Sequence, residues 1–145
     1  MCCLVIYYWY SMKIVGVSQK AVIFNNQGQL VVIQRGKSAP SNPLKWDLPG
    51  GVLDFGEEPR SSIIREIKEE AGLKVQNLIV FDVEGHINKI GDYWVTIAYK
   101  AKANTTKITL GWEHTEYKWV NYGEFAKLPS IPKIVRFVNN AVKLN

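Results

Sequence analysis

The sequence predicts an α/β fold of the α+β type, in which a mixed β-sheet packs between helices. Three observations support this fold class. Short aliphatic runs alternate with turn residues early in the chain, one longer segment has a helical apolar repeat, and further short apolar runs follow it. The length of 145 residues suits one domain, and a composition of 47% hydrophobic and 21% charged residues is typical of globular proteins.

The first eleven residues differ from the rest of the chain. Residues 4–10 are apolar and aromatic, but they are too few to span a bilayer and lack the flanks of a signal peptide. Met12 opens an ordinary protein start, so we expect either translation from Met12 or an added strand before it. We therefore divide the chain into a leader, residues 1–11, and a single domain, residues 12–145. Cys2 and Cys3 lie in the leader without zinc-site spacing, which makes the cytoplasm the default location.

Two aliphatic runs near the start of the domain predict a β-hairpin. Residues 21–24 and 30–33 are separated by a stretch rich in turn-forming residues. Residues 35–45 are polar and contain two prolines, which indicates a loop. A short strand is expected at residues 46–48, where a Pro-Gly-Gly sequence ends it.

Residues 59–71 have the repeat of an amphipathic helix. An apolar stripe runs along one side, formed by Ile63, Ile64, Ile67 and Ala71. Pro59 suits the first turn of this helix, and Gly72 suits the residue just past its end.

After this helix the chain predicts more strands and two helices. The expected strands are residues 78–81, 93–101, 108–110 and 117–120. Residues 121–124 resemble a capping box that would begin a short helix. Residues 130–132 would begin a terminal helix that reaches about Leu144, with an apolar face of Ile134, Val135, Val138 and Val142.

Three glutamates crowd one side of the first predicted helix. Glu66, Glu69 and Glu70 stand at i, i+3 and i+4, which places them together at about 100° per residue. Like charges at this spacing repel by roughly 0.2–0.5 kcal/mol per pair. One interpretation is a solvated acidic face relieved by Arg65 and Lys68. The other is a divalent-ion site, because carboxylate oxygens suit magnesium.

The residues around these glutamates favour the metal-site interpretation. Residues 51–73 read as Gly, five residues, Glu, seven residues, Arg-Glu, an aliphatic, any residue, Glu-Glu, any residue, Gly and an aliphatic. This segment resembles the Nudix box at every fixed position. The chain is therefore identified as a member of the Nudix hydrolase family. The resemblance implies a Nudix-like α/β/α sandwich and magnesium-dependent hydrolysis of a diphosphate linkage in a nucleotide, with Mn²⁺ able to substitute for Mg²⁺.

The resemblance also implies roles for residues of the box. In this family the helix glutamates hold the metal, so the expected ligands here are the Gly50 carbonyl, Glu66, Glu69 and Glu70. Arg65 is expected to pair with glutamates of the box and to orient them. Gly51 would let the backbone approach the ion and the substrate, since a side chain would obstruct both. The expected catalytic residues within the box are Glu57, Arg65, Glu69 and Glu70.

A carboxylate must also accept the proton of the attacking water. Many Nudix relatives take this base from the box, whereas MutT-type relatives use a glutamate of a later loop. Glu113 occupies a comparable place here, and Glu116 is the second choice. A solvated surface position is the alternative for both glutamates and for the neighbouring His114.

Substrate selectivity in this family lies outside the box. The proline marker of ADP-ribose hydrolases is absent, and the tyrosine marker of dinucleoside polyphosphate hydrolases is matched only by Tyr93, a few residues late. By elimination, the resemblance favours a MutT-type nucleoside triphosphate pyrophosphohydrolase that releases nucleoside monophosphate and pyrophosphate. Hydrolysis of ADP-ribose, nucleotide sugars or dinucleoside polyphosphates, and a non-catalytic nucleotide-binding module, are the alternatives.

Arg35, Trp46 and Gly51 are the expected substrate-binding residues. Four aromatic residues could stack on a base, with core packing as the alternative for each: Trp46, Tyr93, Trp94 and Trp112. Arg35 could reach a phosphate or a base edge, or lie plainly on the surface. The net charge of +5 favours anionic partners, but no dense basic run of the kind that binds nucleic acid is present. We therefore expect a nucleotide substrate rather than nucleic acid or a membrane, and an apolar strand or helix face could form a homodimer.

Overall fold

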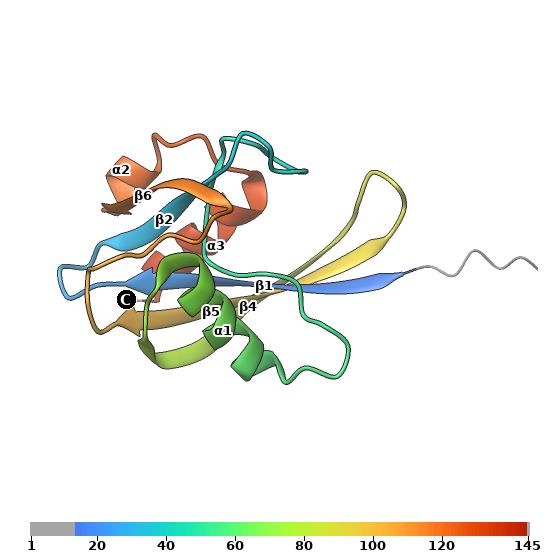
Figure 1. Ribbon diagram of the computed structural model, residues 1–145, viewed down its shortest axis with the longest axis horizontal. Coiled ribbons are helices and arrows are strands. Elements are labelled where there is room, and N and C mark those ends of the chain that lie inside the picture. The colour runs from blue at the N-terminus through green and yellow to red at the C-terminus, as the bar shows by residue number, and fades with distance from the viewer. Residues whose placement is uncertain (1–13, 145) are drawn as a thin grey trace, which may run out of the picture.

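A six-stranded mixed β-sheet forms the centre of the computed structural model, which describes residues 14–144 (Figure 1). The strands are β1 (Val15–Phe24), β2 (Leu30–Arg35), β3 (Trp46–Asp47), β4 (Val75–Ile87), β5 (Tyr93–Ala103) and β6 (His114–Val120). The helices are α1 (Pro59–Ala71), α2 (Tyr122–Phe125) and α3 (Pro132–Lys143). The strand order is β3-β2-β1-β5-β4, and β6 pairs with β2. The predicted leader, residues 1–11 with Cys2 and Cys3, lies outside the described residues, as does Met12.

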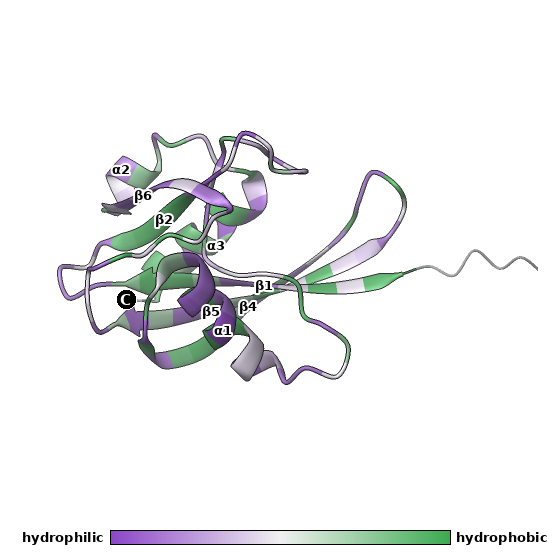
Figure 2. Cartoon of the chain, in the orientation of Figure 1, coloured by the Kyte–Doolittle hydropathy of each residue, from purple (hydrophilic) through white to green (hydrophobic). Residues whose placement is uncertain are grey.

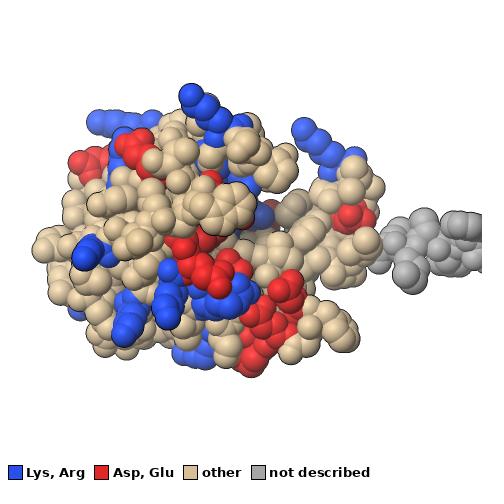
Figure 3. Space-filling model, in the orientation of Figure 1, with Lys and Arg blue, Asp and Glu red and all other residues tan. Residues whose placement is uncertain are grey.

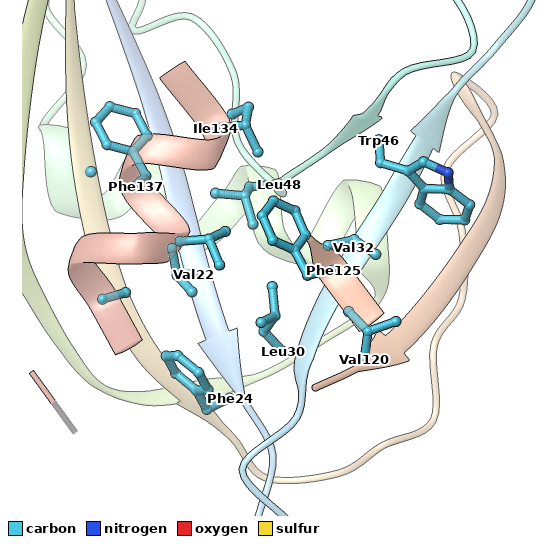
Figure 4. Packing of buried hydrophobic residues seen from close by; sticks show 13 residues of the cluster. Val22, Phe24, Leu30, Val32, Trp46, Leu48, Val120, Phe125, Ile134 and Phe137 are labelled. Atoms are coloured by element: carbon cyan, nitrogen blue, oxygen red, sulfur yellow. The ribbon is translucent and has the colours of Figure 1, made fainter. Parts of the chain in front are cut away.

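The sheet separates two hydrophobic cores. Val22 and Phe24 of β1 belong to the core on the side of α2 and α3, which Figure 4 shows in detail. Ala21 and Ile23, the alternate residues of the same strand, belong to the core beneath α1. β1 and β5 are parallel neighbours, whereas β1 and β2 are antiparallel. The predicted sandwich of helices around a mixed sheet is therefore confirmed.

Helix α1 begins and ends where the sequence predicts. The Glu58 carboxylate caps it by accepting a hydrogen bond from the Ser61 N–H at 2.7 Å. Gly72 ends it with a left-handed φ of 68°. The predicted apolar stripe is wrong at Ile64, which is exposed while Ser62 is buried, because consecutive residues of a helix point about 100° apart.

The two C-terminal helices also begin where predicted. Asn121 and Glu124 form the capping box of α2, with each side chain accepting the other residue's N–H at 2.9 and 2.8 Å. In α3 the buried face is rotated from the predicted one, since Val135 is exposed and the large Phe137 ring packs edge-on against Phe81 at 6.5 Å. The buried side chains of α3 are Ile134, Phe137, Val138 and Ala141. No helix within residues 14–144 is long and apolar enough to cross a membrane.

The strand predicted at residues 108–110 is wrong. This segment lies against the end of α1 instead, where the Thr109 N–H donates to the Ala71 carbonyl at 3.0 Å. The Gly111 N–H donates to the Glu70 carbonyl, also at 3.0 Å. Its hydrogen bonds thus satisfy carbonyls that a helix leaves free at its C-terminal end. As a result, the loop that follows is fixed beside α1.

Gly50 and Gly51 lie in a gap between strands β1 and β2 of the sheet. Strands β1 and β2 separate beyond their hairpin, and residues 46–53 enter between them. β3 pairs with β2, and then the Gly51 carbonyl accepts a hydrogen bond from the Gln19 N–H at 2.8 Å. Gly50 has a φ of 149°, and a Cβ there would overlap the Gln19 carbonyl. Only glycine therefore fits at this point, where the chain crosses from the sheet to α1.

Candidate active site

Arg65 joins three carboxylates on the outer side of α1. Its Nε and Nη2 donate to the two oxygens of Glu57 at 3.0 and 3.2 Å. Its Nη1 donates to Glu66 at 2.8 Å and to Glu69 at 3.0 Å. The hydrogen bonds to Glu57 raise the pKa of Arg65 still further above neutrality and lower the pKa of Glu57. The loop before α1 thus folds back so that residues eight positions apart meet in a bidentate pair.

The glycine pair contacts the remaining glutamates of the helix. The Gly50 N–H donates to Glu70 Oε2 at 2.9 Å. A Cβ on Gly51 would lie 2.5 Å from the Glu66 carboxyl carbon, so the absence of a side chain makes room for that carboxylate. The structure therefore brings together the box residues that the sequence analysis singled out.

Glu70 and His114 form a buried titratable pair. Burial raises the pKa of Glu70 to about 7, although Lys20 and the Gly50 N–H oppose this shift. His114 Nε2 lies 4.0 Å from Glu70 Oε1, and the His114 side chain is only 4% exposed. Burial lowers the pKa of His114 to about 4, and the positive charge of the nearby Lys20 contributes in the same direction. A surface position for His114 is therefore wrong, because the loop fixed beside α1 turns this imidazole inward.

The carboxylates line a pocket of about 450 Å³ beside α1. Its walls are Glu66, Glu69, Glu70, Gly111, Trp112, Glu113 and His114. Figure 3 shows acidic side chains gathered over α1 with basic ones among them. Glu113 is exposed at this pocket, whereas Glu116 lies in β6 and pairs with Lys118 at 3.5 Å. Of the two loop glutamates, only Glu113 thus faces the carboxylates of the box.

The donor set of this pocket fits a hard divalent cation. Carboxylate and carbonyl oxygens are the ligands that magnesium takes in proteins. Within residues 14–144, no three Asp, Glu, His or Cys side chains already converge on one point. Glu66 and Glu69 are instead hydrogen-bonded to Arg65, and Glu70 to Gly50. Binding an ion therefore requires these carboxylates to turn from Arg65 and Gly50 toward the pocket.

A buried charge cluster, which the sequence analysis missed, lies next to this pocket. Lys20 Nζ contacts Asp47 Oδ2 at 2.8 Å, and Arg35 Nη1 contacts the same oxygen at 3.3 Å. Burial alone would raise the pKa of Asp47, but Lys20, the Leu48 N–H and Arg35 hold it below its usual value. The one available signal was a lysine inside the apolar strand β1. Arg35 is thus a partner of Asp47 rather than a free surface arginine.

A larger cavity has a volume of about 840 Å³, and its walls include Ser18, Glu84, His86, Trp94 and Lys133. Lys133 Nζ donates to Thr96 Oγ1 at 3.1 Å, and burial lowers the pKa of Lys133. Lys20 and Asp47 act electrostatically on His114 and also on Lys133. They therefore lie near both the carboxylate pocket and this cavity.

Two buried polar atoms of the cavity wall lack hydrogen-bond partners among the described residues. Glu84 Oε2 and His86 Nδ1 are buried without a hydrogen bond among the described residues. Such atoms are costly unless a ligand or water satisfies them. The cavity wall thus contains polar side chains of both signs, Glu84 and Lys133 among them.

The four aromatic candidates occupy different environments. Trp46 is buried in the core of Figure 4 with Lys118 over its ring at 4.8 Å, so its expected role in stacking is corrected to packing. Trp112 is 93% exposed at the carboxylate pocket. Trp94 lies across Gly16 and lines the large cavity. Tyr93 lies on the opposite face of β5, away from both.

Comparisons with known proteins agree on one family. A family model described as the NUDIX domain matches residues 16–140. A MutT-like protein of Streptomyces ambofaciens is 27% identical over 77% of this chain and 67% of its own length. A putative 8-oxo-dGTP diphosphatase 3 of Mycobacterium tuberculosis is 35% identical over 60% of this chain and 42% of its own length. The chain therefore spans between about two fifths and two thirds of these curated relatives.

Solved structures show the same fold. A MutT protein from Methanosarcina mazei Go1 superposes with a TM-score of 0.77 at 23% identity, covering 92% of this chain and 97% of that one. The NUDIX domain of Shewanella oneidensis NrtR, crystallised with ADP ribose, superposes with a TM-score of 0.79 at 18% identity, covering 95% and 93%. A similar fold thus occurs in proteins whose sequences differ widely from this one.

Proposed function

This chain belongs to the Nudix family, and from that premise we propose that it is a metal-dependent hydrolase of a diphosphate linkage in a nucleotide. The observation that carries the proposal is the arrangement of Glu66, Glu69 and Glu70 around one pocket, where Arg65 and the Gly50 N–H hold them by hydrogen bonds. The resemblance found in the sequence and the matching family model agree on this segment.

The metal ligands in this proposal are the Gly50 carbonyl, Glu66, Glu69 and Glu70. Magnesium is the proposed ion, with manganese as its substitute, because all four ligands offer oxygen. When bound, the ion supplies charge neutralisation of phosphate oxygens and a lowered pKa for the attacking water. Gly51 keeps the space beside Glu66 open, and Arg65 holds Glu57 against the start of the helix.

Glu113 is the proposed base for the attacking water. It is exposed at the same pocket as the helix glutamates, so a water between them lies within reach of its carboxylate. The Glu113 carbonyl accepts a hydrogen bond from the Gly36 N–H at 3.0 Å, which fixes the loop. His114 remains neutral at neutral pH because of its lowered pKa, so it adds no positive charge to the pocket.

The rest of the substrate is proposed to occupy the large cavity. In this proposal the cations of Lys20 and Arg35, which both pair with Asp47 near the pocket, partly offset the charge of the phosphate chain. Ser18, Glu84 and Lys133 offer donors and acceptors for a nucleoside. We propose a nucleoside triphosphate, cleaved to nucleoside monophosphate and pyrophosphate, because several relatives bear the name 8-oxo-dGTP diphosphatase.

A substrate panel tests this proposal. Purified protein with magnesium would be incubated with canonical and oxidised nucleoside triphosphates, ADP-ribose, nucleotide sugars and dinucleoside polyphosphates. Products would be identified by phosphorus NMR. We expect pyrophosphate release from a nucleoside triphosphate, and its loss with a chelator. Tight nucleotide binding without turnover of any compound would instead show a non-catalytic module.

A further inference from the structure

Three polar side chains form one row across the sheet at the large cavity. Ser18 of β1 pairs with Thr96 of β5, and Thr96 pairs with Glu84 of β4. The Ser18 and Thr96 hydroxyls are hydrogen-bonded at 2.8 Å. Figure 2 shows pale and hydrophobic residues alternating along the part of β1 that runs past α1, because successive residues of a strand point to opposite faces. The polar row thus lies on one face of the sheet.

Lys133 of α3 contacts the same row. Its Nζ donates to Thr96 Oγ1 at 3.1 Å. Burial lowers the pKa of Lys133, and the charge of Glu84 opposes this shift, so the two opposite charges lie near each other. Thr96, rather than Glu84, is the hydrogen-bond partner of the ammonium among the described residues. Because an ammonium has three N–H donors, donors remain for a ligand.

The Glu84 carboxylate lacks donors of its own. Its side chain is 21% exposed, and its Oε2 is buried without a hydrogen bond among the described residues. Its Oε1 lies 3.9 Å from His86 Nδ1, which is too long for a hydrogen bond. A carboxylate oxygen that is removed from water without a donor is costly. A ligand that satisfies Glu84 must therefore bring N–H or O–H groups to it.

Trp94 gives the cavity an aromatic wall. A Cβ on Gly16 would lie 2.6–2.7 Å from three neighbouring ring atoms of Trp94, so the indole lies face-on over Gly16. Since one face of the ring covers β1, the part of this half-buried ring that lines the cavity includes its other face. Aromatic faces bind planar heterocycles by stacking. The cavity thus combines a stacking surface with one negative and one positive side chain.

The polar row adjoins the glycine pair of the box. Ser18 forms a β-bridge with Val52, the residue after Gly51. The next residue of β1, Gln19, donates its N–H to the Gly51 carbonyl at 2.8 Å. A nucleotide with its base in the cavity can therefore direct its phosphates past this bridge toward the box. This step rests on the proposed function, which places the nucleoside in the cavity.

We propose that Glu84 and Lys133 select guanine among the nucleobases, with the base stacked on Trp94. Guanine presents N1–H and the N2 amino group side by side, which suits the two oxygens of a carboxylate, and its O6 follows next to them for the ammonium. Adenine and cytosine place a ring-nitrogen acceptor beside their amino group, and uracil and thymine place one N–H between two carbonyls. Each of these bases would turn an acceptor toward the second Glu84 oxygen. The edge of guanine therefore matches both charges.

Titration calorimetry on the full chain with magnesium tests this selection. The ligands are guanosine, inosine and adenosine 5′-monophosphate. Inosine differs from guanosine only by the missing 2-amino group, so it loses one charge-assisted hydrogen bond to Glu84. We expect guanosine monophosphate to bind about tenfold more tightly than inosine monophosphate. Its advantage over adenosine monophosphate should be about 100-fold, since adenine leaves the buried carboxylate imperfectly paired.

Two variants separate the roles of the two charges. Glu84→Gln should lower the ratio of guanosine to adenosine monophosphate affinity at least tenfold, because an amide offers the acceptor and donor that adenine needs. Lys133→Met should weaken guanosine and inosine monophosphate equally, since both bases carry O6. Glu116→Gln is the control: Glu116 pairs with Lys118 in β6, and this variant should bind like the wild type. Circular dichroism checks that each variant is folded.

Equal affinities of the wild type for guanosine and inosine monophosphate would overturn the proposal, and this comparison needs no variant. An unchanged ratio of guanosine to adenosine monophosphate affinity in folded Glu84→Gln would also overturn it, as would no binding of any of the three compounds. Turnover is measured separately. Guanine selectivity without hydrolysis of any triphosphate would refute the proposed enzymatic activity alone, whereas hydrolysis with equal affinities would refute the selection of guanine alone.

Discussion

The carboxylate pocket and the large cavity differ in how their carboxylates are held, although each has a buried histidine Nδ1 without a hydrogen bond among the described residues, His114 and His86. At the pocket, Arg65, Glu66 and Glu69 are hydrogen-bonded to one another. In the cavity, Glu84 and His86 keep buried atoms without a partner among the described residues. The difference teaches that Arg65 holds the pocket carboxylates in one arrangement until an ion binds, whereas Glu84 Oε2 and His86 Nδ1 in the cavity wall make no hydrogen bond among the described residues. Changes at the pocket should therefore act on turnover, and changes in the cavity on binding.

The largest expected effect is at the pocket. Glu69→Gln and Glu70→Gln each remove a charged oxygen of a proposed metal ligand while keeping the size of the side chain. We expect kcat for nucleoside triphosphate hydrolysis to fall by about 10³-fold. Glu58→Gln is the control, because Glu58 caps α1 outside the pocket and should keep full activity. Steady-state kinetics measures this effect, and an unchanged circular dichroism spectrum shows that each variant is folded. Full activity in both pocket variants would refute the proposed roles of Glu69 and Glu70.

Replacing Arg65 by lysine should have the next largest effect. Lysine cannot make the bidentate pair with Glu57 while also donating to Glu66 and Glu69. We expect kcat/KM to fall by about 10–100-fold, together with weaker manganese binding in calorimetry, since Arg65 is proposed to orient the metal ligands to which it is hydrogen-bonded. Manganese binding like that of the wild type would show that the orientation of the glutamates does not depend on Arg65.

In the cavity, Lys133→Ala should change binding more than turnover. Lys133 lies in the wall and donates only to Thr96 among side chains. We expect KM to rise by about tenfold, the scale of one charge-assisted hydrogen bond, with kcat within about twofold. Lys143→Ala, on the exposed far end of the same helix, should leave both constants unchanged. A fall in kcat without a change in KM would contradict the assignment of the cavity to binding.

The pH dependence of stability should differ between wild type and Glu70→Gln without metal. The raised pKa of Glu70 makes its stabilising contribution complete below pH 4.5 and lost as pH rises to about 7. The lowered pKa of His114 acts oppositely, since its contribution is complete above pH 6.5 and lost as pH falls to about 4. As pH rises from 4.5 to about 7, the free energy of unfolding of Glu70→Gln should therefore increase relative to that of the wild type by up to about 3 kcal/mol. Urea unfolding at several pH values measures it, and a pH-independent difference would exclude a raised Glu70 pKa.

The smallest expected effect is at Trp112. Its indole is exposed beside the pocket and has no partner that the fold requires, so its removal should leave stability unchanged. We expect Trp112→Ala to raise KM by about threefold through lost stacking on the substrate, and Trp112→Phe to retain most of the affinity. Identical KM values in all three proteins would remove Trp112 from the binding surface.

The same contrast decides what the sequence could predict. Glu66, Glu69 and Glu70 of the box are neighbours in the chain, and helical geometry alone places them on one side of α1, whereas Glu57 reaches Arg65 only because the loop before α1 folds back. Ser18, Glu84 and Lys133 come from three distant elements that only the folded sheet brings together, so no local pattern marks them. His114 and the false strand at residues 108–110 share one cause. The backbone of their segment donates hydrogen bonds to carbonyls at the C-terminal end of α1 instead of pairing in the sheet. A hydrophobic pattern does not show which of these two partners the segment takes.

The central claim is that chemistry and selectivity are divided between the pocket and the cavity. The most direct test measures kcat and KM of wild type, Glu70→Gln and Lys133→Ala side by side, on the nucleoside triphosphate that the panel identifies. We expect Glu70→Gln to lose kcat with KM nearly unchanged, and Lys133→Ala to raise KM with kcat nearly unchanged. Losses of the same kind in both variants would contradict the division.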